Sequence, residues 1–293
     1  MNSDEKIVIS NIPSISAIYF GLLQNGYNFF AFERDEEHIN SIKEFQHSGF
    51  SSHFFAKTKQ NTCDAYPFWP RAAMLETATF FLNSDMTSFS NPEKYHKQIM
   101  SAGNITDIER NTLFWEWVDL FPLELKKVFI SDKFKEYLEW EYQWLHRQNT
   151  IHREDLKILK DCIDFCANHY RSPINNVKVA LSAIKCVYSS DYHIVGDCFI
   201  FSSGAFKVGS VIHEFLHHVI HPVVISNKNR ILTRKQRYKD IDTSYYLSGD
   251  ESGILNAFDE YLVRLLTAKV LDGTLPTDLE TYIDSILELE NSL

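Results

Sequence analysis

The chain has 293 residues, of which 44% are hydrophobic and 14% aromatic, enough for one large domain or two modest ones with a packed core. Its 10 glycines and 8 prolines exclude a fibrous or low-complexity protein. A formal net charge of -10 without a basic tail disfavours a nucleic-acid partner, because binding phosphates requires clustered Lys and Arg side chains.

The sequence carries no sign of export or of membrane insertion. Residues 1–6 do not begin a basic segment followed by a long apolar run, so we expect no secretory signal. No segment shows the roughly 18 apolar residues that a membrane-spanning helix needs. The five cysteines lack the spacing of a disulfide framework. We therefore expect a cytoplasmic protein with no membrane partner, while the sequence predicts no oligomeric state.

Apolar spacing predicts a mostly helical chain that also contains a few strands. The predicted helices are 35–45, 72–82, 107–144, 154–170, 206–220, 252–271 and 278–289. Two stretches rich in β-branched and aromatic residues, 177–184 and 193–201, predict the two strands of a hairpin. Pro222 is expected to end the helix before it, and Gly273 to close the helix 252–271 as a C-cap.

These elements predict an α+β fold in two parts. A mainly helical N-terminal part, 1–170, leads into a metal-binding catalytic part, 171–293, with a small antiparallel sheet and two active-site helices. The two parts form either separate domains or one compact unit.

The strongest functional signal is the segment His213-Glu214-Phe215-Leu216-His217. Histidines four apart lie on one face of a helix, so His213 and His217 can bind the same zinc ion. Glu214 lies about 100° further around that helix, where its carboxylate can accept a proton from a metal-bound water without binding the metal. Val211 and Ile212 place the motif in an amphipathic, half-buried helix. The alternative is a helix that merely exposes two histidines.

A catalytic zinc site needs a third protein ligand, and the helix 252–271 supplies the best one. This helix is apolar nearly all round, which is typical of a buried helix whose polar groups need partners. Glu260 is predicted as the third ligand because it lies on a strip of small and polar residues. The strip also contains Gly253, Asn256, Ala257, Arg264 and Thr267.

Other ligands and roles stay open on the same two helices. Asp259 and Glu251 are alternative third ligands, and His221 is another if it turns toward the metal. Asp259 is also a candidate to orient a ligand imidazole, or to form a buried ion pair. Arg264 either binds a carbonyl or carboxylate of the substrate or pairs with one of the two acidic residues before it.

The motif helix and the later glutamate resemble a gluzincin, a zinc metallopeptidase with two ligand histidines on one helix and a glutamate on another. More narrowly, the segment 211–218, Pro222 and the segment 260–264 resemble an uncharacterised bacterial family of zinc-peptidase-like proteins. The resemblance covers about 175–272 and departs at Leu216, where that family has a small Ser. It implies zinc, a zincin-like arrangement of a sheet edge and paired helices, and peptide hydrolysis.

The resemblance also implies where substrate binds. Gluzincins hold a peptide along an antiparallel edge strand, here the stretch 193–201, and stabilise the oxyanion with a His or Tyr. Tyr246 is predicted for that role, with Tyr245 and His193 as alternatives. The basic segment 228–239 is either a lid that favours acidic substrates or a solvated loop face.

The predicted function is therefore a zinc-dependent metallopeptidase in which Glu214 activates water to hydrolyse a peptide or protein substrate. The alternative is a catalytically inactive module that binds metal or a partner and retains the motif helix.

Overall fold

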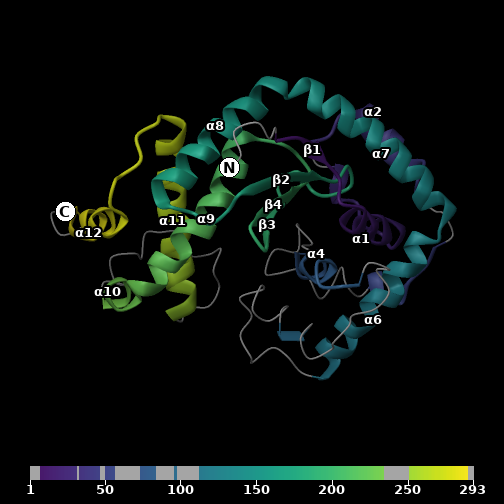
Figure 1. Cartoon of the computed structure of the whole chain (residues 1–293). Helices are drawn as coiled ribbons and strands as arrows, with labels where there is room; N and C mark the ends of the chain where they lie inside the picture. Colours follow the sequence, from purple (N-terminus) through teal and green to yellow (C-terminus); the bar gives the residue numbers. More distant parts are fainter. Residues whose placement is uncertain are drawn as a thin grey trace. The chain divides into compact units, whose positions relative to one another are not determined.

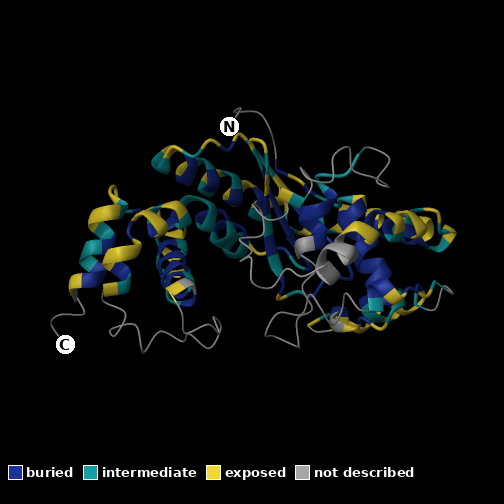
Figure 2. Ribbon diagram, turned by 90° about the horizontal axis from the view of Figure 1, so that it is seen from below, coloured by how far each residue is buried: buried dark blue, intermediate teal, exposed yellow. Residues whose placement is uncertain are grey.

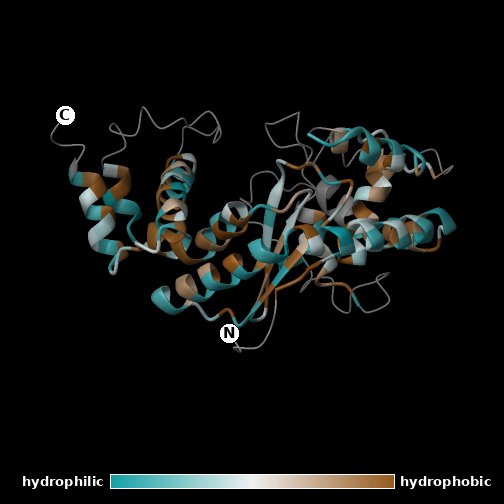
Figure 3. Cartoon of the chain, turned by 90° about the horizontal axis from the view of Figure 1, so that it is seen from above, coloured by the Kyte–Doolittle hydropathy of each residue, from teal (hydrophilic) through white to brown (hydrophobic). Residues whose placement is uncertain are grey.

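The computed structural model describes residues 7–31, 33–46, 50–56, 73–83, 96–97, 112–233 and 251–289. The described elements are, in chain order, β1 (Ile9–Ser10), α1 (Pro13–Gln24), the 3-10 helix η1 (Phe29–Ala31), α2 (Glu36–Lys43), α4 (Ala73–Thr79), α6 (Thr112–Phe129), α7 (Asp132–Ile151), α8 (Arg153–Tyr170), β2 (Asn176–Leu181), β3 (Ser190–Val195), β4 (Cys198–Ser203), α9 (Val208–Ser226), α10 (Lys228–Thr233), α11 (Glu251–Leu271) and α12 (Leu279–Leu289). Hydrophobic and hydrophilic residues alternate along many of these helices, the pattern of amphipathic helices (Figure 3). The fold is a mostly helical α+β structure, as the sequence predicts.

The four described strands form one mixed sheet in the order β1-β2-β4-β3 (Figure 1). β1, β2 and β4 run parallel, and β3 runs antiparallel to β4. The prediction of an antiparallel sheet is therefore wrong. The hairpin also lies elsewhere: it joins β3 to β4, and its turn falls inside the stretch 193–201 that was predicted as one strand. Gly196, with φ +63°, and Asp197 form that turn, and a glycine followed by Asp is a common two-residue hairpin loop.

The chain divides into two compact units that interleave in sequence. We call 7–153 with 176–206 the sheet unit, and 154–175 with 207–293 the helical unit. The division differs from a single boundary near residue 170, because β2 pairs with the two-residue strand β1 and so stays with the N-terminal helices. A strand that short has no hydrophobic period, so this pairing could not be predicted from the sequence.

The sheet unit is built around α1, whose residues from Ser14 to Leu23 are all buried. This helix packs against α4, α6 and α7. Beside it, the amine of Lys185 is fully buried and bonds to Glu76 Oε1 and Asp191 Oδ2, both at 2.8 Å. Ser202 also accepts from the amine, through its Oγ at 3.0 Å and its backbone oxygen at 3.2 Å. This buried ion cluster joins α4, the loop after β2, β3 and β4.

The helical unit is dominated by the packing of α9 against α11. Each of these helices has a buried side and a more exposed side (Figure 2). The expectation that Pro222 ends the motif helix is wrong, because α9 continues to Ser226 with the proline inside it. A proline inside a helix costs about 3 kcal/mol. The last turn is stabilised by the buried side chain of Val224 and by the side-chain amide of Asn227, whose Nδ2 donates to the backbone oxygen of Val223 at 2.9 Å.

The C-cap predicted at Gly273 is confirmed, and the structure also shows how the last helix begins. Gly273 follows α11 with φ +65°, and the amide of Thr274 donates to the oxygen of Lys269 at 2.8 Å, which is a helix-ending pattern. Asp278 precedes α12 and accepts from the amide of Glu280 at 3.0 Å, as an N-capping residue does.

By length and composition, α9 is one helix in the described part of the chain that is apolar enough to cross a membrane. Its 19 residues include four histidines and Glu214, so the expectation that no membrane-spanning segment is present remains a prediction. The core helix of a soluble protein can have the same length and apolar composition.

Candidate metal centre

Two imidazoles from α9 point at one another. His213 and His217 are one helical turn apart, and their Nε2 atoms are 3.1 Å apart. The rings lie edge to face at a centroid distance of 4.8 Å, so they converge through their nitrogens rather than stacking. α9 holds this pair because Ile212, Phe215 and Leu216 are fully buried, which turns the adjoining face of the helix toward α11.

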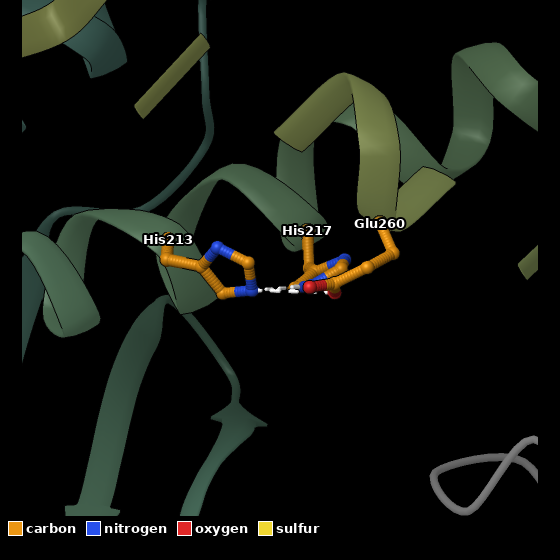
Figure 4. A group of neighbouring side chains, drawn as sticks. All are labelled: His213, His217 and Glu260. Atoms are coloured by element: carbon orange, nitrogen blue, oxygen red, sulfur yellow. Dashed lines mark hydrogen bonds and ion pairs between the residues drawn. The ribbon is translucent and has the colours of Figure 1, made fainter. Parts of the chain in front are cut away.

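Glu260 completes the group from α11 (Figure 4). Its Oε2 is 3.4 Å from His213 Nε2 and 3.3 Å from His217 Nε2. Within the described residues, these three side chains form a group whose ligand atoms all lie within 4.8 Å of one another. Buried Phe258, Leu262 and Val263 fix the orientation of α11 that brings Glu260 to this point.

The spacing of these three atoms fits a tetrahedral zinc ion. Zinc binds imidazole nitrogen and carboxylate oxygen at about 2.0–2.2 Å, so two of its tetrahedral ligands lie about 3.3–3.5 Å apart. The observed separations are 3.1, 3.4 and 3.3 Å, a nearly equilateral triangle. Two imidazoles and one carboxylate are also a donor set that catalytic zinc sites use.

Asp259 fixes which nitrogen of His217 faces the group. Hydrogen bonds from His217 and His221 outweigh burial and lower the pKa of Asp259, so it is ionised at neutral pH and only accepts hydrogen bonds. His217 Nδ1 lies 2.9 Å from Asp259 Oδ1 and must therefore carry the proton. In the neutral imidazole this leaves the lone pair on Nε2, the atom that points at His213 and Glu260.

Arg264 pairs with the third member of the group. Its Nε donates to Glu260 Oε1 at 2.6 Å, while Glu260 Oε2 faces the two histidines. The side chain of Arg264 is 64% exposed and that of Glu260 only 17%. The structure thus shows the ion-pair alternative for Arg264, with the pair leaving one carboxylate oxygen for the triangle.

The group favours a cation at its centre. Burial alone would lower the pKa of His217, but hydrogen bonds to Asp259 and Glu260 and the charge of Glu214 raise it to about 10. Glu260 is also buried, yet its hydrogen bonds to His213 and His217 hold its pKa well below the usual range. The three carboxylates of Glu214, Asp259 and Glu260 against the guanidinium of Arg264 give a negative field, which favours a positive charge at the group, either on a protonated His217 or on a divalent cation that binds in place of that proton.

The remaining predicted residues divide into three groups. Glu214 is half-buried on α9, and its effect on the pKa of His217 places it within electrostatic reach of the group. Glu251 is exposed in the first turn of α11 and lies outside the triangle. Tyr245 and Tyr246 lie outside the described residues, as does the second half of the basic segment 228–239.

His193 forms hydrogen bonds within the sheet unit. It is buried in the sheet unit, with Nε2 at 3.0 Å from Glu76 Oε2 and Nδ1 at 3.2 Å from Thr77 Oγ1. Both ring nitrogens therefore have partners, and His193 is no candidate for an oxyanion-stabilising group.

His221, which was left open as an alternative third ligand, lies outside the triangle. It lies on the same face of α9 as the other two histidines, but its Nδ1 bonds to Asp259 Oδ2 at 2.8 Å. Its spacing of four residues from His217 was visible in the sequence, whereas its partner on another helix was not.

No family model matches the chain, and no curated protein and no solved structure matches it either. The resemblance to gluzincins therefore rests on the motif residues themselves.

Proposed function

We propose that the chain is a zinc-dependent metallopeptidase. The observation that carries the proposal is the triangle formed by His213 Nε2, His217 Nε2 and Glu260 Oε2, with sides of 3.1 to 3.4 Å. Its donor types and spacing suit a three-ligand zinc site with a fourth position left for water or substrate.

Each residue of the site has a distinct part in this proposal. His213, His217 and Glu260 hold the ion, Asp259 keeps His217 in the tautomer that binds metal, and Arg264 holds the second oxygen of Glu260. A zinc ion in such a site lowers the pKa of water and polarises a carbonyl group. Glu214, next to the first ligand and not part of the triangle, is suited to accept a proton from water and pass it to the leaving amine.

The fold supports the proposal only in outline. A mostly helical α+β chain with one four-stranded sheet is compatible with a zincin-like catalytic part, in which α9 and α11 are the two active-site helices. Tyr246 remains our candidate for stabilising the oxyanion, and a cytoplasmic peptide or protein our candidate substrate.

A single substitution separates catalysis from metal binding. The Glu214→Gln variant is expected to retain zinc while losing cleavage of a peptide library, since it removes the proton acceptor and leaves the triangle intact. Removal of a general base lowers the rate by about 100- to 10,000-fold. Wild-type protein that holds zinc without cleaving any peptide would instead support the inactive metal-binding module, and wild-type protein without zinc would refute both.

A further inference from the structure

Three imidazoles on α9 alternate with two carboxylates on α11. His213, His217 and His221 are spaced four residues apart and share a face, while Asp259 and Glu260 are consecutive. Glu260 lies between the first two imidazoles, and Asp259 lies between the last two. His217, in the middle, therefore contacts both carboxylates through its two different ring nitrogens.

The two contacts to Asp259 use both of its oxygens. His217 Nδ1 is 2.9 Å from Oδ1, and His221 Nδ1 is 2.8 Å from Oδ2. The Asp259 side chain is only 5% exposed, so water offers little alternative to either bond. Because a carboxylate only accepts, both histidines donate, and each bond restricts rotation of the same planar group.

We propose that His221 is a positioning residue of the metal centre: by donating to Asp259 Oδ2, it holds the carboxylate that orients His217 as a ligand. The inference rests on the proposed zinc site. It assigns no metal contact to His221, whose Nδ1 faces Asp259. A carboxylate held at both oxygens keeps His217 Nε2 directed at His213 and Glu260 with less freedom than one held at a single oxygen.

The physical consequence is a dependence of zinc affinity on a side chain that never touches zinc. Loss of a group that orients a ligand typically weakens metal binding by about 10- to 100-fold. His221 is one hydrogen bond further from the metal site than Asp259. We therefore expect its loss to weaken zinc binding by about ten-fold, near the lower end of that range.

Two substitutions at His221 distinguish the effect of its hydrogen bond from the effect of its size. Asn places its amide nitrogen close to the position of His Nδ1, so His221→Asn retains a donor to Asp259, whereas His221→Leu removes the donor and keeps an apolar side chain. His218→Leu is the matched control, because His218 is also a half-buried histidine of α9.

The experiment measures zinc affinity of the full chain by competition with a chromophoric chelator, and the visible absorption of the Co²⁺-loaded protein. We expect about ten-fold weaker zinc binding and an altered Co²⁺ spectrum for His221→Leu, and near wild-type values for His221→Asn and His218→Leu. Thermal unfolding in the presence of a chelator should show a folded chain for every variant, with a lower midpoint for His221→Leu than for His221→Asn because Leu leaves Asp259 Oδ2 without that donor.

Two results would overturn the inference while leaving the zinc site in place: wild-type affinity in His221→Leu, or an equal loss in His221→Asn and His221→Leu. A wild-type chain that binds no zinc would overturn the proposed function as well. The two failures are therefore distinguishable.

Discussion

Replacing Lys185 with Met should destabilise the sheet unit strongly. The Lys185 amine is fully buried and lies 2.8 Å from both Glu76 and Asp191, and the carboxylate of Glu76 is also fully buried. Removing one partner of a buried ion pair leaves an uncompensated charge and costs about 3–5 kcal/mol. We expect a loss of that size in the free energy of unfolding, measured by urea denaturation with the fluorescence of Trp140 and Trp144, which lie in the same unit.

The loss should depend on pH in a defined direction. Burial by itself raises the pKa of Glu76, but Lys185 and His193 outweigh it and lower the pKa from 4.5 to about 2. A depressed pKa contributes stability above the unfolded-state pKa, and this stability disappears as pH falls toward 2. Without the amine, Glu76 protonates at higher pH, so the difference between wild type and Lys185→Met should shrink between pH 4.5 and pH 2.

Two further variants test the reasoning. Lys178→Met replaces an exposed lysine of β2 and should change stability by less than about 0.5 kcal/mol. Adding Glu76→Gln and Asp191→Asn to Lys185→Met removes the unpaired charges and should recover part of the loss. A loss below about 1 kcal/mol for Lys185→Met, or one that stays constant across this pH range, would contradict the account of the buried ion cluster.

Four other substitutions test the space around two glycines and the cap of one helix. At Gly204 an added Cβ would lie 2.0 Å from the oxygen of Lys185 and 2.6 Å from that of Cys186, so Gly204→Ala should cost about 3 kcal/mol or more in thermal or urea unfolding. Gly209→Ala, with nothing within 4 Å, should instead stabilise the first turn of α9 by up to about 1 kcal/mol, and an equal effect of both changes would refute the steric argument. Asp278→Ala should cost about 1 kcal/mol through loss of the α12 cap, and Asp278→Asn should retain most of it.

More of the candidate site than of the sheet could be predicted from the sequence. The positions of the three candidate ligands follow local periodicity: His213 and His217 share a face of one helix, and Glu260 lies on the polar strip of another. Local spacing also singled out Asp259 as a group that could orient an imidazole. The contact between α9 and α11 then brings these faces together, because each helix has a buried apolar side that the other covers.

What the sequence could not supply were long-range pairings. Lys185 and Glu76 are 109 residues apart, and neither belongs to a motif that predicts the other. The parallel contact of Ile9 with Val179 joins residues that are even further apart in sequence. The turn at Gly196 had a local signal, a glycine followed by an aspartate, but the β-branched and aromatic residues around it favoured one continuous strand.

The central claim is that two histidines and one glutamate hold a zinc ion, and the zinc content of four matched variants tests it most directly. The wild-type chain, purified without chelators, should contain one zinc ion, and His217→Ala and Glu260→Ala should lose it. The neighbouring histidine and the exposed carboxylate of α11 lie outside the triangle, so His218→Ala and Glu251→Ala should retain zinc. A wild-type chain without zinc, or a Glu260→Ala variant that binds zinc as well as Glu251→Ala, would contradict the account.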